Sequence, residues 1–354
     1  MMLPEQLLKS LVNIPSVSGN ENEIADFVYD YLNENGLDAK RVENNVYCSV
    51  GKGKTMLLNS HLDTVPPSKS WKSNPYKANE ANGKIYGLGA CDAKASITSM
   101  ICTMTNLIKS EKELGGRVIF SAVCEEELES RGIKELIKKI PSFEAAVIGE
   151  PTNLDIAVAQ KGIVRAKMLS KGKSAHASLR GVNAIHKAAD DIEKIKGLVF
   201  KKKHLLGYPS VQVTMINAGI GKNVIPDRCE SILDIRTTPV YPNNYMINLI
   251  RKLVKSEIEI MSNRIFPKET NIKEGIVRAA RLANKKARTT GFFAACDLAF
   301  IDKPGIILGP GSPNQAHSPG EFVEIRQLRK ADIIYQNLIK NFFSFETPNI
   351  LRIL

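Results

Sequence analysis

Several short apolar segments, each the length of a buried strand, lead directly into histidine or carboxylate side chains. These segments are Thr55–Leu58, Val118–Val123 and Ala145–Ile148. The ionisable residues that follow them are His61 with Asp63, the run Glu125–Glu127, and Glu150. Parallel strands that alternate with helices present their carboxyl ends at one edge of a sheet, where α/β folds place their chemistry. The repetition therefore predicts an α/β fold with one cleft at that edge.

A glycine-rich stretch leads in the same way into Asp92, just before an apolar helix expected to end near Leu107. The stretch lacks the third glycine of a dinucleotide-binding loop. Taken alone, Asp92 suits a helix N-cap, His61 a hydrogen-bonded loop residue, and Glu125–Glu127 the acidic start of a helix. Three adjacent carboxylates repel one another unless cations compensate. Their recurrence at one expected sheet edge favours a shared, cation-binding cleft.

The middle of the chain has a different pattern, with alternating strand and helix signals of its own. Strands are expected at 163–170, 211–217 and 231–236, and helices at 183–195 and 244–260. This pattern predicts a small α/β sandwich inserted into the first domain. We therefore expect a main domain formed by 1–162 and 272–354, with 163–271 as the insertion. In the main domain, we expect strands 46–50 and 55–59 to pair around a glycine turn.

The composition is that of an ordinary globular protein, with 354 residues, 43% apolar and 24% charged. No apolar run approaches the roughly 20 residues of a membrane-spanning helix. The N-terminus lacks the basic and apolar regions of a secretory signal, so we expect a cytoplasmic protein without a membrane partner. The six cysteines are scattered and form no Cys-x-x-Cys. They are expected to be reduced thiols rather than disulfides or a zinc finger.

The net charge of +12 raises the possibility of a nucleic-acid partner. However, the densest basic cluster, Lys201–His204, has no interleaved aromatic residues and belongs to no nucleic-acid-binding motif. We therefore expect no nucleic-acid binding. A solvated lysine-rich surface, or attraction of an anionic substrate, accounts for the charge.

Six motifs resemble, in order, those of the di-zinc amidohydrolases, which include aminoacylases, acetylornithine deacetylase, succinyl-diaminopimelate desuccinylase and related carboxypeptidases. The motifs are His61–Pro66, Gly87–Lys94, Glu125–Glu127, Gly149–Thr152, Ser174–His176 and Ala316–Glu321. The resemblance spans nearly the whole chain. It implies a zinc-exopeptidase-like catalytic domain, with a mixed sheet flanked by helices, and an inserted α/β sandwich that serves as lid and dimerisation domain.

The resemblance also implies a site for two Zn²⁺ ions, which Co²⁺ or Mn²⁺ could replace. The ligands would be His61 and Glu150 for one ion, Glu127 and His317 for the other, and Asp92 as the bridge. Asp63 would orient His61. Glu126 would be the general base that activates water. A slip of one residue within the glutamate run would reassign the roles of Glu126 and Glu127.

Further roles come from the same resemblance. The inserted domain would form a homodimer, in which His176 reaches the partner's active site and stabilises the tetrahedral oxyanion. A loop histidine without that role is the alternative. Asn223, Arg236 and the backbone of Gly311 and Ser312 would bind the carboxylate of the substrate, a role that suits the planar fork of arginine.

The segments Gly87–Gly89, Asp92–Ala93 and Trp71–Tyr76 are most similar to the acetylornithine deacetylase branch. The expected reaction is hydrolysis of N2-acetyl-L-ornithine to acetate and L-ornithine, a step of arginine biosynthesis. Ala95 departs from the glycine that many relatives carry. The alternatives are a succinyl-diaminopimelate desuccinylase, a hydrolase that releases lysine or ornithine from a carrier protein, and a metallo-dipeptidase. A non-catalytic binding protein on the same scaffold is disfavoured because every implied ligand and the base are present.

Overall fold

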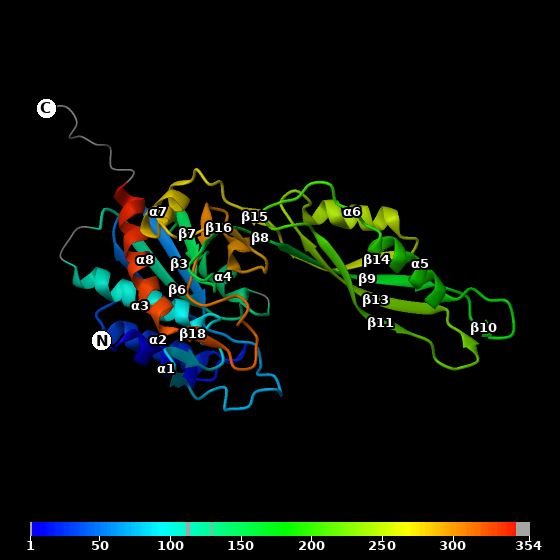
Figure 1. Cartoon of the computed structure of the whole chain (residues 1–354), viewed down its shortest axis with the longest axis horizontal. Helices are drawn as coiled ribbons and strands as arrows, with labels where there is room; N and C mark the ends of the chain where they lie inside the picture. Colours follow the sequence, from blue (N-terminus) through cyan, green and yellow to red (C-terminus); the bar gives the residue numbers. More distant parts are fainter. Residues whose placement is uncertain (1, 111–113, 129, 345–354) are drawn as a thin grey trace. The chain divides into compact units, whose positions relative to one another are not determined.

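The computed structural model describes residues 2–110, 114–128 and 130–344. The chain divides into two compact units (Figure 1). Unit 1 comprises Met1–Val158, Thr270–Thr290 and Cys296–Leu354, and unit 2 comprises Ala159–Glu269 and Gly291–Ala295. The expectation of an α/β fold with a mixed sheet flanked by helices is confirmed.

A large mixed sheet forms the centre of unit 1, and its last strand belongs to unit 2. Its strands, in their order across the sheet, are β1 (Lys40–Val42), β2 (Asn45–Gly51), β6 (Arg117–Val123), β3 (Thr55–His61), β7 (Ala145–Ile148), β17 (Gly305–Ile307), β8 (Ile156–Gln160) and β15 (Lys268–Glu269), with β16 (Thr289–Phe292) paired to β8. The four strands β6, β3, β7 and β17 are mutually parallel. Their carboxyl ends therefore lie at one edge of the sheet.

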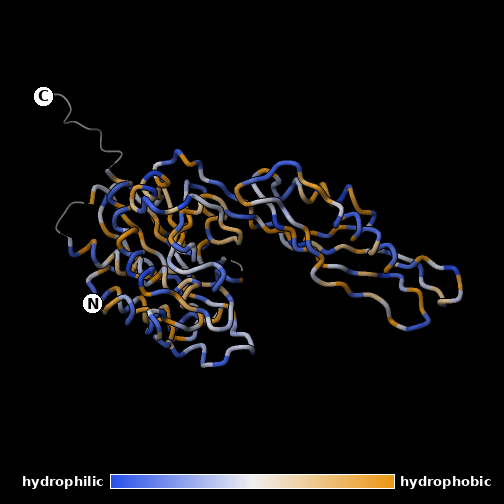
Figure 2. The backbone as a smooth tube through the Cα atoms, viewed as in Figure 1, coloured by the Kyte–Doolittle hydropathy of each residue, from blue (hydrophilic) through white to orange (hydrophobic). Residues whose placement is uncertain are grey.

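Helices and a small second sheet complete unit 1. The helices are α1 (Pro4–Asn13), α2 (Asn22–Glu34), α3 (Lys94–Lys109), α4 (Arg131–Leu136), α7 (Gly275–Ala283), α8 (Ile325–Ser344) and the 3-10 helix Asp297–Phe300. The small sheet consists of β4 (Asn79–Ala81), β5 (Lys84–Tyr86) and β18 (Phe322–Glu324). Helix α3 is buried along most of its length and packs against α1, α8 and β3. Figure 2 shows apolar segments concentrated inside this unit, where they form its largest core cluster.

Unit 2 is an antiparallel sheet with two helices packed on it. The strands are β11 (Ser210–Ala218), β13 (Arg228–Thr237), β9 (Gly162–Lys171) and β14 (Glu257–Ile265), in that order. Helices α5 (Ala184–Lys196) and α6 (Asn243–Leu253) pack on this sheet, and the short strands β10 (Ala175–His176) and β12 (Val224–Ile225) form a separate pair. Alternate residues of β9, such as Val164, Ala166 and Met168, are fully buried in its core. The sheet thus has one face covered by helices.

Two local expectations were wrong. Strands β2 and β3 do not pair with each other, because β6 lies between them. Every residue of β3 is buried, which suits a central strand with a neighbour on each side rather than one arm of a hairpin. The expected helix 244–260 ends at Leu253, and the chain then forms β14. The carboxylate of Asp191 accepts hydrogen bonds from the backbone N–H groups of Lys255 and Ser256, which fixes this change of direction.

In the described part of the chain, no helix has the length and apolar character required to cross a membrane.

Candidate active site

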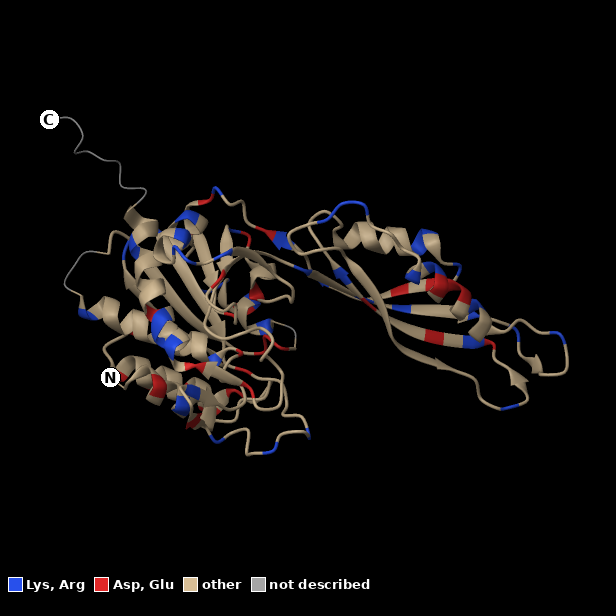
Figure 3. Ribbon diagram, in the orientation of Figure 1, with Lys and Arg blue, Asp and Glu red and all other residues tan. Residues whose placement is uncertain are grey.

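The carboxyl edge of the parallel strands in unit 1 carries most of the expected site residues. His61 is the last residue of β3, and Glu150 comes two residues after β7. The glutamate run follows β6, and His317 lies in the long loop between β17 and β18. Asp92 comes from the loop between β5 and α3. Figure 3 shows several acidic residues in the loops of unit 1, whereas Lys and Arg are spread over both units.

Asp92 lies between two histidines. Its Oδ1 is 3.2 Å from Nε2 of His61, and its Oδ2 is 3.4 Å from Nε2 of His317. Asp92 is not the N-cap of α3, since Ala93 occupies that position. Burial alone would raise the pKa of the Asp92 carboxyl, but the hydrogen bonds from both histidines hold it well below the usual range. The two oxygens of one carboxylate therefore face two separate imidazole donors.

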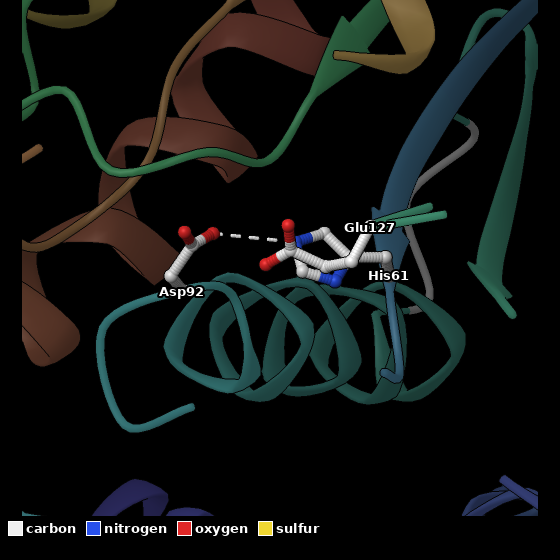
Figure 4. Close-up of side chains that lie close together, drawn as sticks. All are labelled: His61, Asp92 and Glu127. Atoms are coloured by element: carbon white, nitrogen blue, oxygen red, sulfur yellow. Dashed lines mark hydrogen bonds and ion pairs between the residues drawn. The ribbon is translucent and has the colours of Figure 1, made fainter. Parts of the chain in front are cut away.

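Each histidine also has a glutamate beside it. Oε1 of Glu127 is 2.7 Å from Nε2 of His317, and Oε1 of Glu150 is 3.8 Å from Nε2 of His61. Donor atoms of His61, Asp92 and Glu127 all lie within 4.8 Å of one another. Figure 4 shows these three side chains grouped together, with the contact between Asp92 and His61 marked.

Burial and close neighbours shift the pKa of most ionisable groups in this cluster. Burial raises the pKa of the carboxyls of Glu126 and Glu150 well above the usual range, although the neighbouring His61 lowers it. The carboxylates of Asp92 and Glu127 raise the pKa of His317 to about 10. Burial would lower the pKa of His61, but Asp63 and Asp92 raise it well above its ordinary value. The carboxylates and imidazoles of this cluster thus shift one another's pKa.

These donors fit a pair of divalent cations. Imidazole nitrogens and carboxylate oxygens are the ligands that zinc and its substitutes take. One ion would be held by His61 and Glu150, a second by Glu127 and His317, and Asp92 would offer one oxygen to each. A carboxylate between two histidines, each with its own glutamate, is the arrangement that supports this assignment.

The carboxylate of Asp63 anchors the chain at the glutamate run. Its Oδ1 accepts a hydrogen bond from the N–H of Glu126 at 3.0 Å, and its Oδ2 accepts from the N–H of Glu127 at 3.1 Å. The hydroxyl of Ser18 donates to Oδ2 at 2.6 Å. Nδ1 of His61 lies closer to the backbone carbonyl of Asp63, at 2.9 Å, than to the carboxylate, at 3.5 Å. Asp63 therefore orients His61 through its backbone and the two glutamates through its side chain.

The three consecutive glutamates have different surroundings. Both carboxylate oxygens of Glu125 accept hydrogen bonds from Arg131, at 2.7 and 2.8 Å. Glu127 contacts His317, and Glu126 interacts electrostatically with His61 and with Asp297. This arrangement favours Glu126 and Glu127, rather than Glu125, as the pair that serves the site.

Gly311 and Ser312 lie beside the loop that carries Asp92. A Cβ atom at Gly311 would come within 2.4 Å of the sulfur of Cys91, so only glycine fits there. The thiol of Cys91 lies 3.4 Å from the backbone carbonyl of Ser312. The N–H of Gly311 donates a hydrogen bond to the side-chain oxygen of Gln327, so this N–H has a partner within the protein.

The remaining three expected residues belong to unit 2. His176 and Asn223 are exposed on neighbouring segments: His176 pairs with Val224 between β10 and β12, and the carbonyl of Asn223 accepts from the N–H of Ala177. Arg236, on β13, forms a two-pronged ion pair with Asp234.

Three buried acids near the site had been given no role from the sequence. Glu21 accepts hydrogen bonds from the N–H groups of Gly19 and Glu125. Asp297 accepts from the amide of Asn59, two residues before His61. Glu321 accepts from three N–H groups in the Asp92 loop. Glu321 is the last residue of one of the six motifs, and this position is a sequence signal that it belongs to the site. Glu21 has no such signal, because its position resembles an ordinary helix start.

Comparison with known proteins adds to this geometry. Residues 57–341 match the model of peptidase family M20/M25/M40. An acetylornithine deacetylase of Buchnera aphidicola (subsp. Schizaphis graminum) is 30% identical, over 95% of this chain and 97% of the relative. A succinyl-diaminopimelate desuccinylase of Wolbachia pipientis is 25% identical, over 96% of this chain and 94% of the relative. The crystal structure of the Bacillus subtilis YXEP protein, a dinuclear metal-binding peptidase, matches with a TM-score of 0.78 at 17% identity. The match covers 96% of this chain and 98% of the YXEP chain.

Replacing Asp63 with asparagine should destabilise the metal-free protein. The amide keeps one acceptor oxygen but turns an NH₂ group toward a backbone N–H or the Ser18 hydroxyl. We expect a loss of about 1–3 kcal/mol in the free energy of unfolding, measured by urea denaturation at neutral pH. The exposed control Asp38→Asn should change this free energy by less than about 0.5 kcal/mol. Equal stabilities of the two variants would contradict the anchoring role of Asp63.

Metal binding should release protons at pH 8. His317, with a pKa of about 10, is protonated at that pH before metal binds, whereas a ligand imidazole must be neutral. Titration calorimetry with Zn²⁺ in two buffers of different ionisation enthalpy measures the release. A His317→Gln variant should release about one proton fewer. The contribution of His317 should vanish as the pH rises through about 10, because no proton then remains to be displaced. Identical heats in both buffers would rule out the release of protons on metal binding.

Proposed function

Because this chain belongs to peptidase family M20/M25/M40, a family of metal-dependent hydrolases, we propose that it hydrolyses the amide bond of an N-acyl amino acid. The observation that carries this proposal is the placement of Asp92 between His61 and His317. The first candidate substrate is N2-acetyl-L-ornithine, with acetate and L-ornithine as products and arginine biosynthesis as the setting. Two Zn²⁺ ions are the proposed cofactors, with Co²⁺ or Mn²⁺ as substitutes, and the cytoplasm is the proposed location.

When bound, two divalent cations polarise a substrate carbonyl and lower the pKa of a water molecule. The side chain that handles the proton is Glu126. Its burial, which raises the pKa of its carboxyl, suits a group that accepts a proton from water and returns it to the leaving amine. Asp63 holds the backbone of Glu126 and so fixes where this proton is received. The cations would be held by the side chains of His61, Glu127, Glu150, His317 and Asp92.

The substrate-binding roles are those that the family resemblance implies. Arg236 and Asn223 are proposed to bind the α-carboxylate, together with backbone groups of Gly311 and Ser312, and His176 is proposed to stabilise the oxyanion. Arginine suits this role because its planar guanidinium can donate two parallel hydrogen bonds to a carboxylate. Arg236 already holds the carboxylate of Asp234 in this way, so a substrate carboxylate would compete with Asp234.

The acyl group is the least constrained part of the proposal. The acetylornithine deacetylase relative, 30% identical over nearly the full length of both chains, supports acetyl. The desuccinylase relative, at 25% identity over a similar share, supports succinyl-diaminopimelate as the second candidate. Release of lysine or ornithine from a carrier protein and dipeptide hydrolysis use the same site chemistry and remain the further alternatives.

A homodimer through unit 2 is also proposed. Strand β11 lies at one edge of the sheet of unit 2 and carries no charged residue, and its Met215 and Ile216 are 68% and 55% exposed. The opposite edge, β14, carries Glu257 and Glu259, which form ion pairs with lysines of β9. Charges on an edge strand oppose pairing with another chain, and an uncharged apolar edge permits it. We therefore assign the dimer contact to β11.

The proposed reaction is tested by hydrolysis of N2-acetyl-L-ornithine, beside N-succinyl-diaminopimelate, with metal-stripped protein before and after addition of Zn²⁺ or Co²⁺. We expect metal-dependent acetate release, reduced about 10²–10⁴-fold in kcat by Glu126→Gln. The matched control Glu125→Gln removes only the pairing with Arg131 and should keep activity within a few-fold.

Each other outcome has a distinct meaning. Activity confined to the succinyl substrate would replace the acetyl assignment and keep the mechanism. A large loss in Glu125→Gln, with Glu126→Gln active, would shift the roles by one residue. Absence of bound metal would refute the proposed mechanism.

The dimer is tested by light scattering coupled to size-exclusion chromatography. Ile216→Lys should convert a dimer to a monomer, because a lysine then lies on the proposed contact strand. Met261→Lys, on the opposite edge strand, should leave the dimer intact. A wild-type monomer at micromolar concentration would refute the assignment.

A further inference from the structure

Glu321 is a fully buried acid, 1% exposed, whose carboxylate holds the loop that carries Asp92. Its Oε1 accepts hydrogen bonds from the N–H of Cys91 at 2.7 Å and from the N–H of Asp92 at 2.9 Å. Its Oε2 accepts from the N–H of Gly89 at 3.1 Å. Three backbone N–H groups thus converge on one buried carboxyl group. The path of the backbone from Gly89 to Asp92 is therefore fixed by one side chain.

The contact of Glu321 with the Asp92 loop follows directly on the backbone hydrogen bonds between β5 and β18. Strands β5 and β18 pair antiparallel, with Tyr86 opposite Phe322. The next backbone hydrogen bond runs from the N–H of Gly87 to the carbonyl of Glu321, at 3.0 Å. Beyond Gly87 the chain turns toward Asp92 and leaves the ladder. The side chain of Glu321 then accepts hydrogen bonds from N–H groups of the loop.

Glu321 also belongs to the segment that carries His317. The N–H of Glu321 donates to the carbonyl of Ser318, and that of Ser318 donates to the carbonyl of Gln315, so the segment is a tight loop. Nε2 of His317 contacts Oδ2 of Asp92 at 3.4 Å. Asp92 is thus held twice by the same loop, at its side chain by His317 and at its backbone N–H by Glu321.

We infer that Glu321 is a positioning residue that sets the Asp92 carboxylate in register with His317 before any cation binds. The inference rests on the proposed function, in which both residues are metal ligands. Glu321 touches neither the substrate nor a cation in this role. It acts through the backbone of Asp92, so its loss should first affect how the metal pair is held.

The experiment measures metal binding rather than turnover. Metal-free wild type, Glu321→Ala, Glu321→Gln and the control Glu324→Ala are titrated with Zn²⁺ and Co²⁺ by calorimetry, and the visible absorption of the Co²⁺ forms is recorded. Glu324, three residues further along on β18, pairs with Arg326 at the surface and makes a matched control. Near-ultraviolet circular dichroism reports whether each metal-free variant is folded.

We expect Glu321→Ala to weaken binding of at least one of the two ions about 10–100-fold and to change the Co²⁺ absorption. Glu321→Gln should fall between Ala and wild type, because its single oxygen can still accept from Cys91 and Asp92 but not from Gly89. Glu324→Ala should match wild type in affinity and spectrum.

Wild-type affinities and spectrum in folded Glu321→Ala would overturn the inference while leaving the proposed function intact. If Glu321→Ala does not fold, wild-type behaviour of Glu321→Gln would overturn it equally. A wild-type protein that binds no pair of ions would instead overturn the proposed function, and this inference with it.

Discussion

The repulsion among buried carboxylates at one edge of a parallel sheet is the constraint around which unit 1 is arranged. Asp63 and Glu150 are almost fully buried, and Asp92 and Glu127 are largely so. Such groups are costly to bury as ions unless opposite charges or N–H donors surround them. The neighbouring carboxylates raise the pKa of His61 and of His317 above its ordinary value, which favours the charged imidazolium of each. A divalent cation supplies that charge more efficiently, because it also satisfies several lone pairs at once.

Backbone N–H groups also compensate the negative charge of buried carboxylates. The side chains of Asp63, Glu21 and Glu321 each accept two or more of them. Asp63 and Glu21 hold the glutamate run, and Glu321 holds the loop that carries Asp92. These carboxylates are too well satisfied to bind a cation readily. Their contribution is rigidity, since a loop whose N–H groups converge on one buried oxygen pair has few alternative paths. The buried acids thus fall into two groups. One group lies in the site, and the other binds backbone N–H groups of the surrounding loops.

The parts of this arrangement that depend on strand direction could be predicted from the sequence. Several apolar runs are each followed by ionisable residues. Parallel strands therefore place His61, the glutamate run and Glu150 at the carboxyl edge of the sheet, in whatever order the strands lie. The order itself could not be predicted, because pairing depends on contacts between distant residues, and β6 lies between β2 and β3. Strand β14 was missed although Glu257-Ile258-Glu259-Ile260 alternates, because the helical pattern before it was extended too far. The role of Glu321 was hidden because its partners are backbone groups about 230 residues away, which leave no trace in side-chain chemistry.

The sheet order has a consequence for synthesis on the ribosome. Strand β17, at Gly305–Ile307, lies between β7 and β8, which precede it by some 150 residues. All four sheet strands of unit 2, by contrast, are complete once Ile265 has been made. Domains generally fold as units during translation. Every strand of the unit 2 sheet is therefore synthesised before β17, the strand that lies between β7 and β8. The loop that brings His317 to Asp92 follows β17 in the chain, so it is among the last parts of the molecule to be placed.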